Sequence, residues 1–476
     1  MKKGLLLLLL PVLSLTGHTQ DKWDLRRCVE YAMANNISIK QSDIQARLSK
    51  LNLEQGQLSQ IPTLGLGASI GLNSGRSQNL ATYTLSTVTY TYNNYSLQAN
   101  ANVFNFFSLR HSIESYRYSW QAALATTDKL KNDISLNVAN AYLQVILATE
   151  QAEAARLQLK LSQNSLEITR KQVNAGTLPE LNAAELESQV AQDSSNVITA
   201  DGTTIQNTLT LKAYMGLDAG TPFEVDTPPL DQIPIEKMED LQPEPVYSMA
   251  LTNQPLQRAD AFMLDAARKS VASSKAAQYP TFSLNGSLGS NYVSSVQQPV
   301  LSSFQSALDT VARVYGSNAP VVTEVGNYTQ YKKMPYFKQL DQNFSQYIGI
   351  SVNVPILNGG LLRTNYKRSK LNLRNQELQR DQDNLTLKQN IYQAYTAAMT
   401  ALQKYEANKI TAAATAKSFE YAQKRYNIGI LNTIDLLTNQ NNFFKAKIDL
   451  LYSRFDYVFK MKVLEFYKGL GIRLSK

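Results

Sequence analysis

Four stretches of the chain alternate between apolar and polar residues, which is the pattern of a β-strand with two different faces. In residues 63–73, leucine, alanine and isoleucine fall on one face, and glycine, serine and asparagine fall mostly on the other. The same alternation returns in residues 95–103, 282–288 and 348–354. These stretches are close to the length that a tilted membrane strand needs, about 9–11 residues. We therefore predict four strands in two pairs, within residues 63–106 and 281–357.

The polar faces of these strands distinguish two interpretations. Alternation alone also fits an ordinary half-buried sheet of a soluble domain. These faces, however, consist of Ser, Asn, Gln and Gly with almost no charge, and tyrosines gather at the strand ends, where a membrane barrel has its aromatic girdle. The pattern therefore favours strands of a membrane barrel. The tyrosines are Tyr83, Tyr90, Tyr92, Tyr328, Tyr331 and Tyr336.

Two much longer segments have a helical pattern. We predict helices over residues 110–175 and 363–428, and at 1.5 Å per residue each would reach about 100 Å. Their apolar residues recur at steps of three and four, which indicates a narrow, alanine-rich coiled-coil seam. In the first helix the seam consists of Leu130, Ile134, Val138, Ala141, Val145, Ala148, Ala152, Ala155 and Leu159.

The chain contains the same unit twice. At a spacing of 253 residues Asn105 aligns with Asn358, Ala141-Tyr142 with Ala394-Tyr395, and Gly176 with Gly429. A shorter spacing of 218 residues aligns the segments before the strands, for example Pro62 with Pro280. The difference between these two spacings places a longer loop in the second copy, between Pro280 and Asn358. We predict two tandem structural repeats.

The repeats define the organisation of the chain. Repeat 1 covers residues 20–217 and repeat 2 covers residues 246–476. Residues 218–245, with six prolines, form a connector that excludes a long helix. Each repeat is predicted to begin with one helix, Trp23–Gln60 or Val246–Gln278.

A glycine follows each long helix. Gly176 and Gly429 stand where a helix ends in a left-handed residue, after a last turn that contains lysine and arginine. Return helices are expected over residues 179–215 and 432–468, with Pro179 near the first position of one and Asn432 as the N-cap of the other. We interpret the two glycines as the turns of two helical hairpins.

The first residues resemble an export signal. Two lysines precede the apolar run Leu5–Leu15, and Gly17 and Thr19 are small residues suited to signal peptidase. We expect residues 1–19 to be removed, so that Gln20 begins an exported chain. The apolar run is too short for a membrane-spanning helix, which needs about 20 residues.

Composition excludes several classes of function. Charged residues make up 18% of the chain, below the roughly one quarter that is usual in soluble domains. The net charge of +9 is spread along the chain without a basic cluster, so nucleic acid is not an expected partner. His111 and Cys28 are the only histidine and cysteine after the signal, which disfavours a His-based triad or a zinc cluster. We expect Cys28 to be a buried small apolar residue, and we expect no catalytic residue, metal or cofactor.

Four strands cannot close around a pore, and an open sheet edge is not tolerated in lipid. Several copies of the chain must therefore share one barrel. Three copies related by rotation would supply twelve strands.

The duplicated unit of strand pair and helical hairpin resembles the TolC-like outer membrane efflux proteins. The segment Pro355–Arg363 ("PILNGGLLR") and the turn Tyr426–Leu437 ("YNIGILNTIDLL") carry the likeness, which covers nearly the whole mature chain. The resemblance implies an α+β membrane protein: a homotrimer that forms a shared twelve-strand barrel in outer-membrane lipid and a tunnel of coiled-coil helices through the periplasm. It also implies a passive exit duct of a tripartite efflux or type I secretion system, with a periplasmic adaptor and an inner-membrane pump as partners.

The resemblance also names candidate residues at the periplasmic aperture. Asp435 matches an acidic position of the family, Tyr426 matches the aromatic residue before the glycine, and Asn182 is the first-copy counterpart of Asp435. Leu431 stands where such channels can carry arginine, so a latch of Arg-to-Asp contacts is not expected. Asp435 has a second interpretation, an acidic residue favoured in the first turn of a helix.

Two other classes of protein remain open from the residues alone. An exported coiled-coil scaffold or adhesin without a pore would explain the long helices but not the four alternating strands. An enzyme would need a paired-carboxylate site, and the acidic residues are scattered along the helices.

Overall fold

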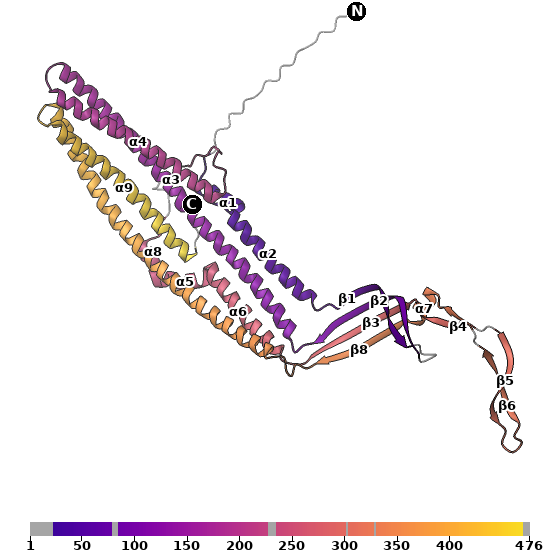
Figure 1. Ribbon diagram of the computed structural model, residues 1–476. Coiled ribbons are helices and arrows are strands. Elements are labelled where there is room, and N and C mark those ends of the chain that lie inside the picture. Colours follow the sequence, from indigo (N-terminus) through magenta and orange to yellow (C-terminus); the bar gives the residue numbers. More distant parts are fainter. Residues whose placement is uncertain (1–21, 79–83, 227–234, 301–302, 328–329, 470–476) are drawn as a thin grey trace, which may run out of the picture. The chain divides into compact units, whose positions relative to one another are not determined.

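The protein is an α+β fold in the computed structural model, which describes residues 22–78, 84–226, 235–300, 303–327 and 330–469 (Figure 1). It divides into two compact units. The first is built from the described parts of Met1–Leu51, Arg117–Ala267 and Asn372–Lys476, and the second from those of Asn52–Tyr116 and Arg268–Leu371. The predicted signal segment 1–19 with Gln20, and the girdle residues Tyr83 and Tyr328, lie outside the described residues.

Two pairs of helices dominate the first unit. Helices α3 (Ser108–Asn174) and α8 (Leu361–Asn427) each have 67 residues, and α4 (Glu180–Met215) and α9 (Thr433–Lys468) each have 36. Every boundary of α8 and α9 lies 253 residues after the matching boundary of α3 and α4. The second half of the chain thus repeats the helix lengths of the first half.

The helix predicted over Trp23–Gln60 is interrupted, so that prediction is wrong in this detail. Helix α1 (Leu25–Asn35) ends before Asn36, and α2 (Ile37–Leu58) begins after it. Asn36 has an extended backbone, because its side-chain amide donates to the carbonyl oxygen of Tyr214 at 2.8 Å and its side-chain oxygen accepts from the amide of Ser38 at 2.9 Å.

The same correction applies to the second copy. Helix α5 (Pro243–Asn253) ends before Gln254, and α6 (Pro255–Ala276) begins with a proline. A residue that precedes proline is driven out of the helical region, which explains the break. The short helix η2 (Met238–Leu241) and the start of α5 occupy the C-terminal end of the predicted connector, while residues 227–234 lie outside the described residues.

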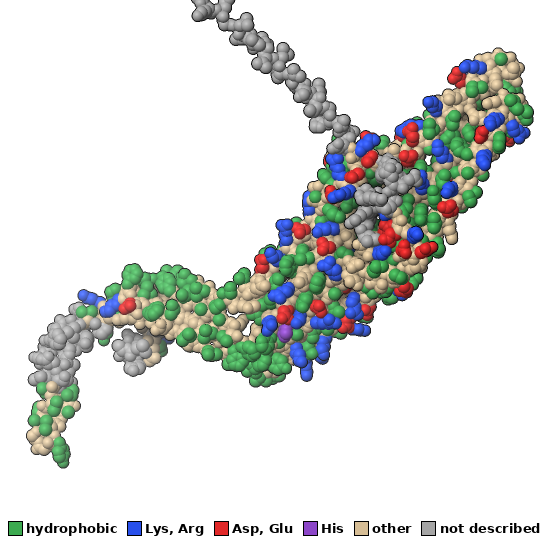
Figure 2. Space-filling view, turned by 180° about the vertical axis from the view of Figure 1, so that it is seen from behind, with side chains coloured by type: hydrophobic (Ala, Val, Ile, Leu, Met, Phe, Trp, Pro, Cys, Tyr) green, Lys and Arg blue, Asp and Glu red, His purple; other side chains and the backbone are tan. Residues whose placement is uncertain are grey.

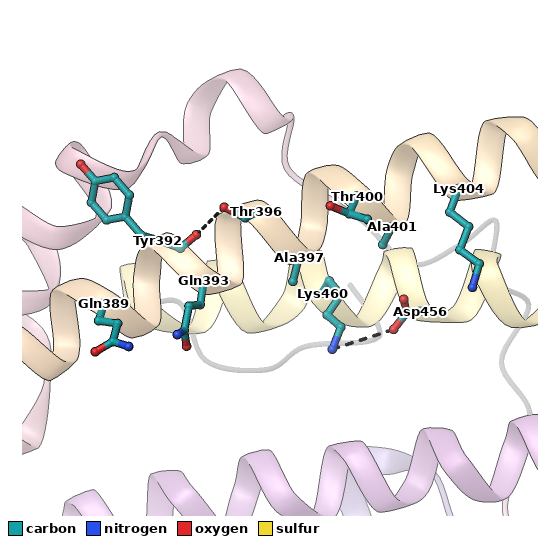
Figure 3. Close-up of a pocket in the computed structure, with 10 residues that line it drawn as sticks. All are labelled: Gln389, Tyr392, Gln393, Thr396, Ala397, Thr400, Ala401, Lys404, Asp456 and Lys460. Atoms are coloured by element: carbon teal, nitrogen blue, oxygen red, sulfur yellow. Dashed lines mark hydrogen bonds and ion pairs between the residues drawn. The ribbon is translucent and has the colours of Figure 1, made fainter.

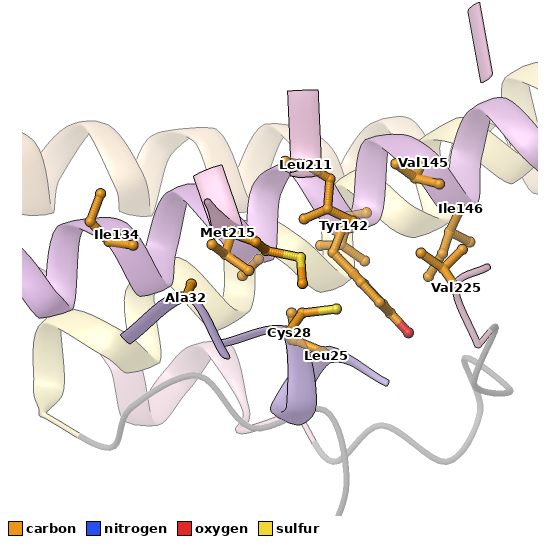
Figure 4. Close-up of a cluster of buried hydrophobic side chains, with 14 of the residues drawn as sticks. Leu25, Cys28, Ala32, Ile134, Tyr142, Val145, Ile146, Leu211, Met215 and Val225 are labelled. Carbon is orange, nitrogen blue, oxygen red and sulfur yellow. The ribbon is translucent and has the colours of Figure 1, made fainter. Parts of the chain in front are cut away.

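A first hydrophobic core joins α1, α3, α4 and α9 (Figure 4). Cys28 is fully buried in it, as the sequence predicted. Tyr142 is also fully buried, and its hydroxyl donates to the carbonyl oxygens of Trp23 and Asp226. This core therefore ties the first described residues and the segment after α4 to the middle of α3.

A second core of the first unit lies where α9 meets α5, η2 and α8. Its fully buried members include Leu241, Ile391 and Met461. Beside it, Lys462 and Glu465 form a buried ion pair at 2.6 Å, and the other carboxylate oxygen of Glu465 accepts from the backbone amide of Glu236. Because both charges are paired and hydrogen-bonded, they can remain buried among apolar side chains.

The second unit contains a four-stranded antiparallel sheet. Strands β1 (Thr63–Gln78), β2 (Leu85–Phe104), β3 (Thr281–Val293) and β8 (Ser345–Asn353) are neighbours in the order β1-β2-β3-β8. The central pairing joins the two halves of the chain, since Asn100 lies opposite Asn285. The four predicted strands therefore form one continuous sheet.

The two faces of this sheet differ in chemistry. Apolar residues of β1 and β8 are exposed, with Leu66 at 81% and Ile348 at 78%. Figure 2 shows apolar side chains gathered over these strands. Neutral polar side chains of neighbouring strands bond to one another: Asn285 donates to Ser351 at 2.7 Å, and Ser283 donates to Asn102 at 3.3 Å.

The longer loop of the second copy is more structured than predicted. It contains two further antiparallel ribbons, β4 (Gln297–Val300) with β7 (Gln330–Lys333) and β5 (Ser303–Arg313) with β6 (Pro320–Asn327). Helix α7 (Tyr336–Gln342) follows β7. None of the helices in the described ranges is both long and apolar enough to cross a bilayer.

One of the predicted girdle tyrosines contacts the sheet from α7. The hydroxyls of Tyr336 and Tyr95 share a hydrogen bond of 2.8 Å, and the ring of Tyr336 lies 4.7 Å from that of Tyr292. These contacts fix α7 on β2 and β3, beside the end of β3.

Asp260 is a half-buried acid whose titration we expect to affect stability. It lies on α6, and one of its oxygens is buried without a hydrogen-bond partner among the described residues. Burial, together with the negative charge of Asp383 on α8, raises the pKa of Asp260 to about 6, and the positive charge of Arg380 opposes this rise. The folded state therefore holds the proton more tightly than the unfolded chain, and the ionised form destabilises the fold above pH 6.

We predict that Asp260→Asn raises the free energy of unfolding at pH 7.5 by about 1 kcal/mol and has little effect at pH 4, because the amide needs no ionisation. Thermal melts followed by circular dichroism at the two pH values measure this. Asp383→Asn is the matched control and should give a smaller gain at pH 7.5, since it removes only the neighbouring charge. Equal effects of Asp260→Asn at both pH values would contradict the assignment.

Candidate functional site at the helix turns

The turn between α3 and α4 is built on Gly176. The backbone amide of Gly176 donates to the carbonyl of Val173 at 2.8 Å, and that of Thr177 donates to Gln172 at 3.0 Å. This pair of bonds closes the end of a helix when the residue after it is left-handed, and Gly176 has a φ of 73°. No atom lies within 4 Å of the position a Cβ would take, so backbone conformation alone requires glycine here.

The turn between α8 and α9 has the same geometry. The amide of Gly429 donates to the carbonyl of Tyr426 at 2.9 Å, and that of Ile430 donates to Arg425 at 3.0 Å. Gly429 has a φ of 76° and nothing within 4 Å of its Cβ position. A glycine with positive φ therefore reverses the chain direction after both long helices.

The return helices begin differently. Asn432 is the N-cap of α9, as predicted, because its side-chain oxygen accepts from the backbone amide of Asp435 at 2.7 Å. Pro179 precedes α4 with an extended backbone and without a side-chain cap, so it occupies the cap position and Glu180 is the first helical residue. This shifts the predicted start of α4 by one residue.

Asp435 lies in the first turn of α9 with an exposed side chain. Its carboxylate has no ion-pair partner among the residues that the structure describes, and its backbone carbonyl accepts from Asn439 at 2.8 Å. Asn182 is half-buried at the matching position of α4. The two candidates therefore differ in both charge and exposure.

Tyr426 connects the two hairpins. Its hydroxyl shares a hydrogen bond of 2.9 Å with the hydroxyl of Thr169, a fully buried residue of α3. This bond joins the last turn of α8 to a late turn of α3. Tyr426 therefore contacts the first hairpin, whereas the side chain of Asp435 is exposed on the second hairpin.

Sequence reasoning missed a buried polar cluster that links α3, α4 and α9. Ser162 donates to Asp193 at 2.5 Å, Gln189 donates to the other carboxylate oxygen at 2.9 Å, and Gln440 donates to Ser162 at 3.2 Å. Asp193 is 2% exposed. An acid on the apolar stripe of Ala183 and Leu186 was the signal in the sequence.

Different contacts brace the two hairpins. In the first, Arg170 of α3 pairs with Glu180 at 3.6 Å and also with Glu187, both on α4. In the second, the stacked rings of Phe419 and Phe443, 5.5 Å apart, join α8 to α9. Within the described ranges, no group of three or more His, Cys, Asp or Glu side chains is placed to hold a metal ion.

Comparison with known proteins gives a consistent result. A family model described as outer membrane efflux protein matches residues 29–217 and 246–458. The chain is 22% identical over 465 residues to the outer membrane protein TolC of Escherichia coli K12, covering 94% of this chain and 84% of TolC. It is 23% identical over 453 residues to the outer membrane efflux protein BepC of Brucella suis, covering 93% and 85%.

The fold also matches a solved structure over nearly its whole length. The CmeC outer membrane channel of Campylobacter jejuni superposes with a TM-score of 0.74 at 16% identity, covering 95% of this chain and 87% of CmeC. At this identity the likeness concerns the fold alone.

We predict that Gly429→Ala destabilises the second turn by about 1–2 kcal/mol, because alanine is strained at positive φ, and that Gly429→Asn has a smaller effect since asparagine visits this region more readily. Hydrogen exchange of the amides around residues 425–436 measures the local opening. The same two substitutions at Gly176 form the matched test and should follow the same order. Equal exchange rates for the alanine and asparagine variants would show that φ is not the constraint.

Proposed function

Since the chain belongs to the outer membrane efflux protein family, we propose that it is the exit duct of a tripartite efflux or type I secretion system. It resides in the bacterial outer membrane and lets substrate pass without making or breaking a bond. The observation that supports this proposal most strongly is the sheet of β1, β2, β3 and β8, with one exposed apolar face and a second lined by neutral polar side chains.

The open edges of that sheet support a trimer. Strands β1 and β8 each have one neighbouring strand in the described chain, so each leaves a row of backbone groups unpaired. Lipid offers no hydrogen bonds to such groups, and other copies of the chain must pair them. Three copies joined edge to edge would give a closed barrel of twelve strands.

The helices support two tandem repeats that form a periplasmic tunnel. The equal lengths of α3 and α8, and of α4 and α9, fit a duplicated hairpin. In the proposed trimer, six such hairpins surround a common axis. Their turns, at Gly176 and Gly429, are where we propose that a periplasmic adaptor and an inner-membrane pump engage the duct.

The contact between Tyr426 and Thr169 suggests how the turns stay together. A hydroxyl-to-hydroxyl bond is neutral and worth about 1 kcal/mol, so a modest force can break it. We propose that this bond, rather than a charge pair, holds the end of α8 against α3 in the resting tunnel. Asp435 then supplies negative charge at the aperture, repeated in three copies.

An exported coiled-coil scaffold or adhesin without a pore remains the second candidate, and the family match does not favour it. It would leave the exposed apolar face of β1 and β8 without a role.

We predict that the chain fractionates with outer membranes and migrates as a trimer that dissociates on heating, because the unpaired strand edges require other copies. Electrophoresis of unheated and heated samples, followed by planar-bilayer recording of the purified trimer, measures both properties. A soluble periplasmic species, or a trimer that never conducts, would refute the channel.

We predict that Asp435→Asn weakens the block of single-channel conductance by divalent cations at the periplasmic side, since it removes three negative charges from a narrow axis. Asp449→Asn, the same charge change about four turns further along α9, is the control and should leave the block unchanged. Block of equal strength in the wild type and in Asp435→Asn would place Asp435 outside the aperture.

A further inference from the structure

The first turns of α8 carry a row of positive charge. Arg363, Lys367 and Lys370 follow one another at steps of four and three residues, so they share one face of the helix, and all three are exposed. Residues 345–371 contain a further cation, Arg368, and no Asp or Glu. We call the three residues of the shared face the basic row, which extends about 10 Å along α8.

The basic row is unfavourable for the helix taken alone. Like charges three or four residues apart repel each other, and positive charge near the start of a helix opposes the helix dipole. Further along α8, Arg374 is paired with Glu377 at 2.8 Å. Over the described ranges, by contrast, none of the three cations of the row has an ion-pair partner, and Lys370 lies over the neutral ring of Tyr366. An anion from outside the chain would remove this repulsion.

An exposed apolar segment connects β8 to the basic row. Ile356 is 84% exposed and Leu357 is 95% exposed, and both lie in the connection between β8 and α8. Ile348 and Ile350 of β8 itself are exposed as well. Apolar surface and positive charge therefore follow each other directly along the second unit, and a partner that covers both must be amphipathic.

Two neighbouring connections have the same order of apolar and basic residues. Phe106 and Phe107 are exposed between β2 and α3, and Arg110 follows them. Tyr279 is exposed between α6 and β3, and Lys275 lies just before it on α6. Because β2, β3 and β8 pair side by side, all three connections lie at one end of the sheet. Figure 2 shows Lys and Arg side chains beside the apolar ones where the helices of this unit meet its sheet.

The two phenylalanines occupy a costly backbone conformation. Phe106 and Phe107 have φ values of 50° and 65°, and their second-copy counterparts are Gly359 and Gly360, with φ values of 61° and 76°. Glycine would remove the strain, so the rings contribute something that outweighs it. The ring of Phe106 stacks on that of Tyr279 at 5.0 Å, and exposed aromatic rings of this kind suit the boundary between lipid and water.

We propose that the basic row binds the phosphate groups of anionic phospholipids in the membrane leaflet on the helix side of the sheet, and that Arg110 and Lys275 add to this site. This inference rests on the proposed membrane barrel and adds the class of lipid that its helix-side rim recognises. The headgroup layer of a leaflet is about 5–8 Å thick, which the row of about 10 Å can span. A soluble anion would leave the neighbouring apolar segment uncovered, whereas the acyl chains of a lipid cover it.

Other lysines of α8 lack this combination of charge and apolar surface. Lys404 lines a groove of about 660 Å³ together with Gln393 and Thr400 (Figure 3). Lys460, which borders the same groove, is paired with Asp456 at 3.9 Å. This groove is therefore lined by neutral polar side chains and a closed ion pair, and Lys404 serves as part of a control.

The test measures lipid binding to the purified trimer in detergent by native mass spectrometry. Phosphatidylglycerol and phosphatidylcholine with the same acyl chains are the probes. The wild type should bind phosphatidylglycerol at least about fivefold more tightly, and Arg363→Gln/Lys367→Gln/Lys370→Gln should lower that affinity on the order of tenfold, because each cation near an anionic headgroup contributes to binding. The preference should also weaken as the salt concentration rises.

Two variants control for folding and for unspecific charge. Arg363→Lys/Lys367→Arg/Lys370→Arg keeps all three charges and should retain the preference for phosphatidylglycerol. Lys404→Gln/Lys409→Gln/Lys417→Gln removes the same charge from exposed positions of the same helix, beginning about 50 Å further along, and should change the affinity less than about twofold.

A trimer that binds both lipids equally, or that loses the preference as strongly in the distant control, would overturn this site and leave the channel intact. Competition by inorganic phosphate at equal ionic strength would show a site for a small anion and overturn the assignment to lipid. If neutralising the row loosens the trimer without changing lipid binding, the row pairs with acids of another copy and the proposal is wrong. Absence of any trimer would overturn the proposed function together with it.

Discussion

Within the residues that the structure describes, the backbone groups along the outer edges of β1 and β8 have no partner strand, and the rest of the structure depends on this constraint. A four-stranded sheet with an exposed apolar face would aggregate in water, and its edges would remain unsatisfied in lipid. Both problems have one solution, a closed sheet made from several chains. In the proposed barrel, the polar face, where Asn285 bonds to Ser351, would line a wet interior, and the face with Leu66 would contact lipid.

The proposed duplication accounts for most of the remaining architecture, and the two copies differ in a few residues near the helix turns. Both hairpins turn on a glycine of positive φ, Gly176 or Gly429. The third residue of the return helix is Asp435 in the second copy and Asn182 in the first. The buried Asp193 belongs to the first copy. In the proposed trimer, a ring of such unequal hairpins would have two kinds of contact, and a change at one kind need not disturb the other.

Local patterns in the sequence predicted the strands and the hairpin ends well, because the alternation of residues 63–73 and the cap at Asn432 depend on neighbours in the chain. Features that depend on distant partners were missed. The break at Asn36 needs the carbonyl of Tyr214, and the bond from Tyr426 needs Thr169 on another helix. The polar cluster around Asp193 was missed for the same reason, since the partners of its carboxylate lie on α3 as well as on its own helix.

Hydrogen exchange of the sheet in the membrane tests the central claim most directly. If neighbouring copies pair the edges, the amides of β1 and β8 should be protected as strongly as those of the central strands β2 and β3. If the chain acts alone, the outward-facing amides of β1 and β8 should exchange rapidly while the central strands remain protected, and the shared barrel would be contradicted.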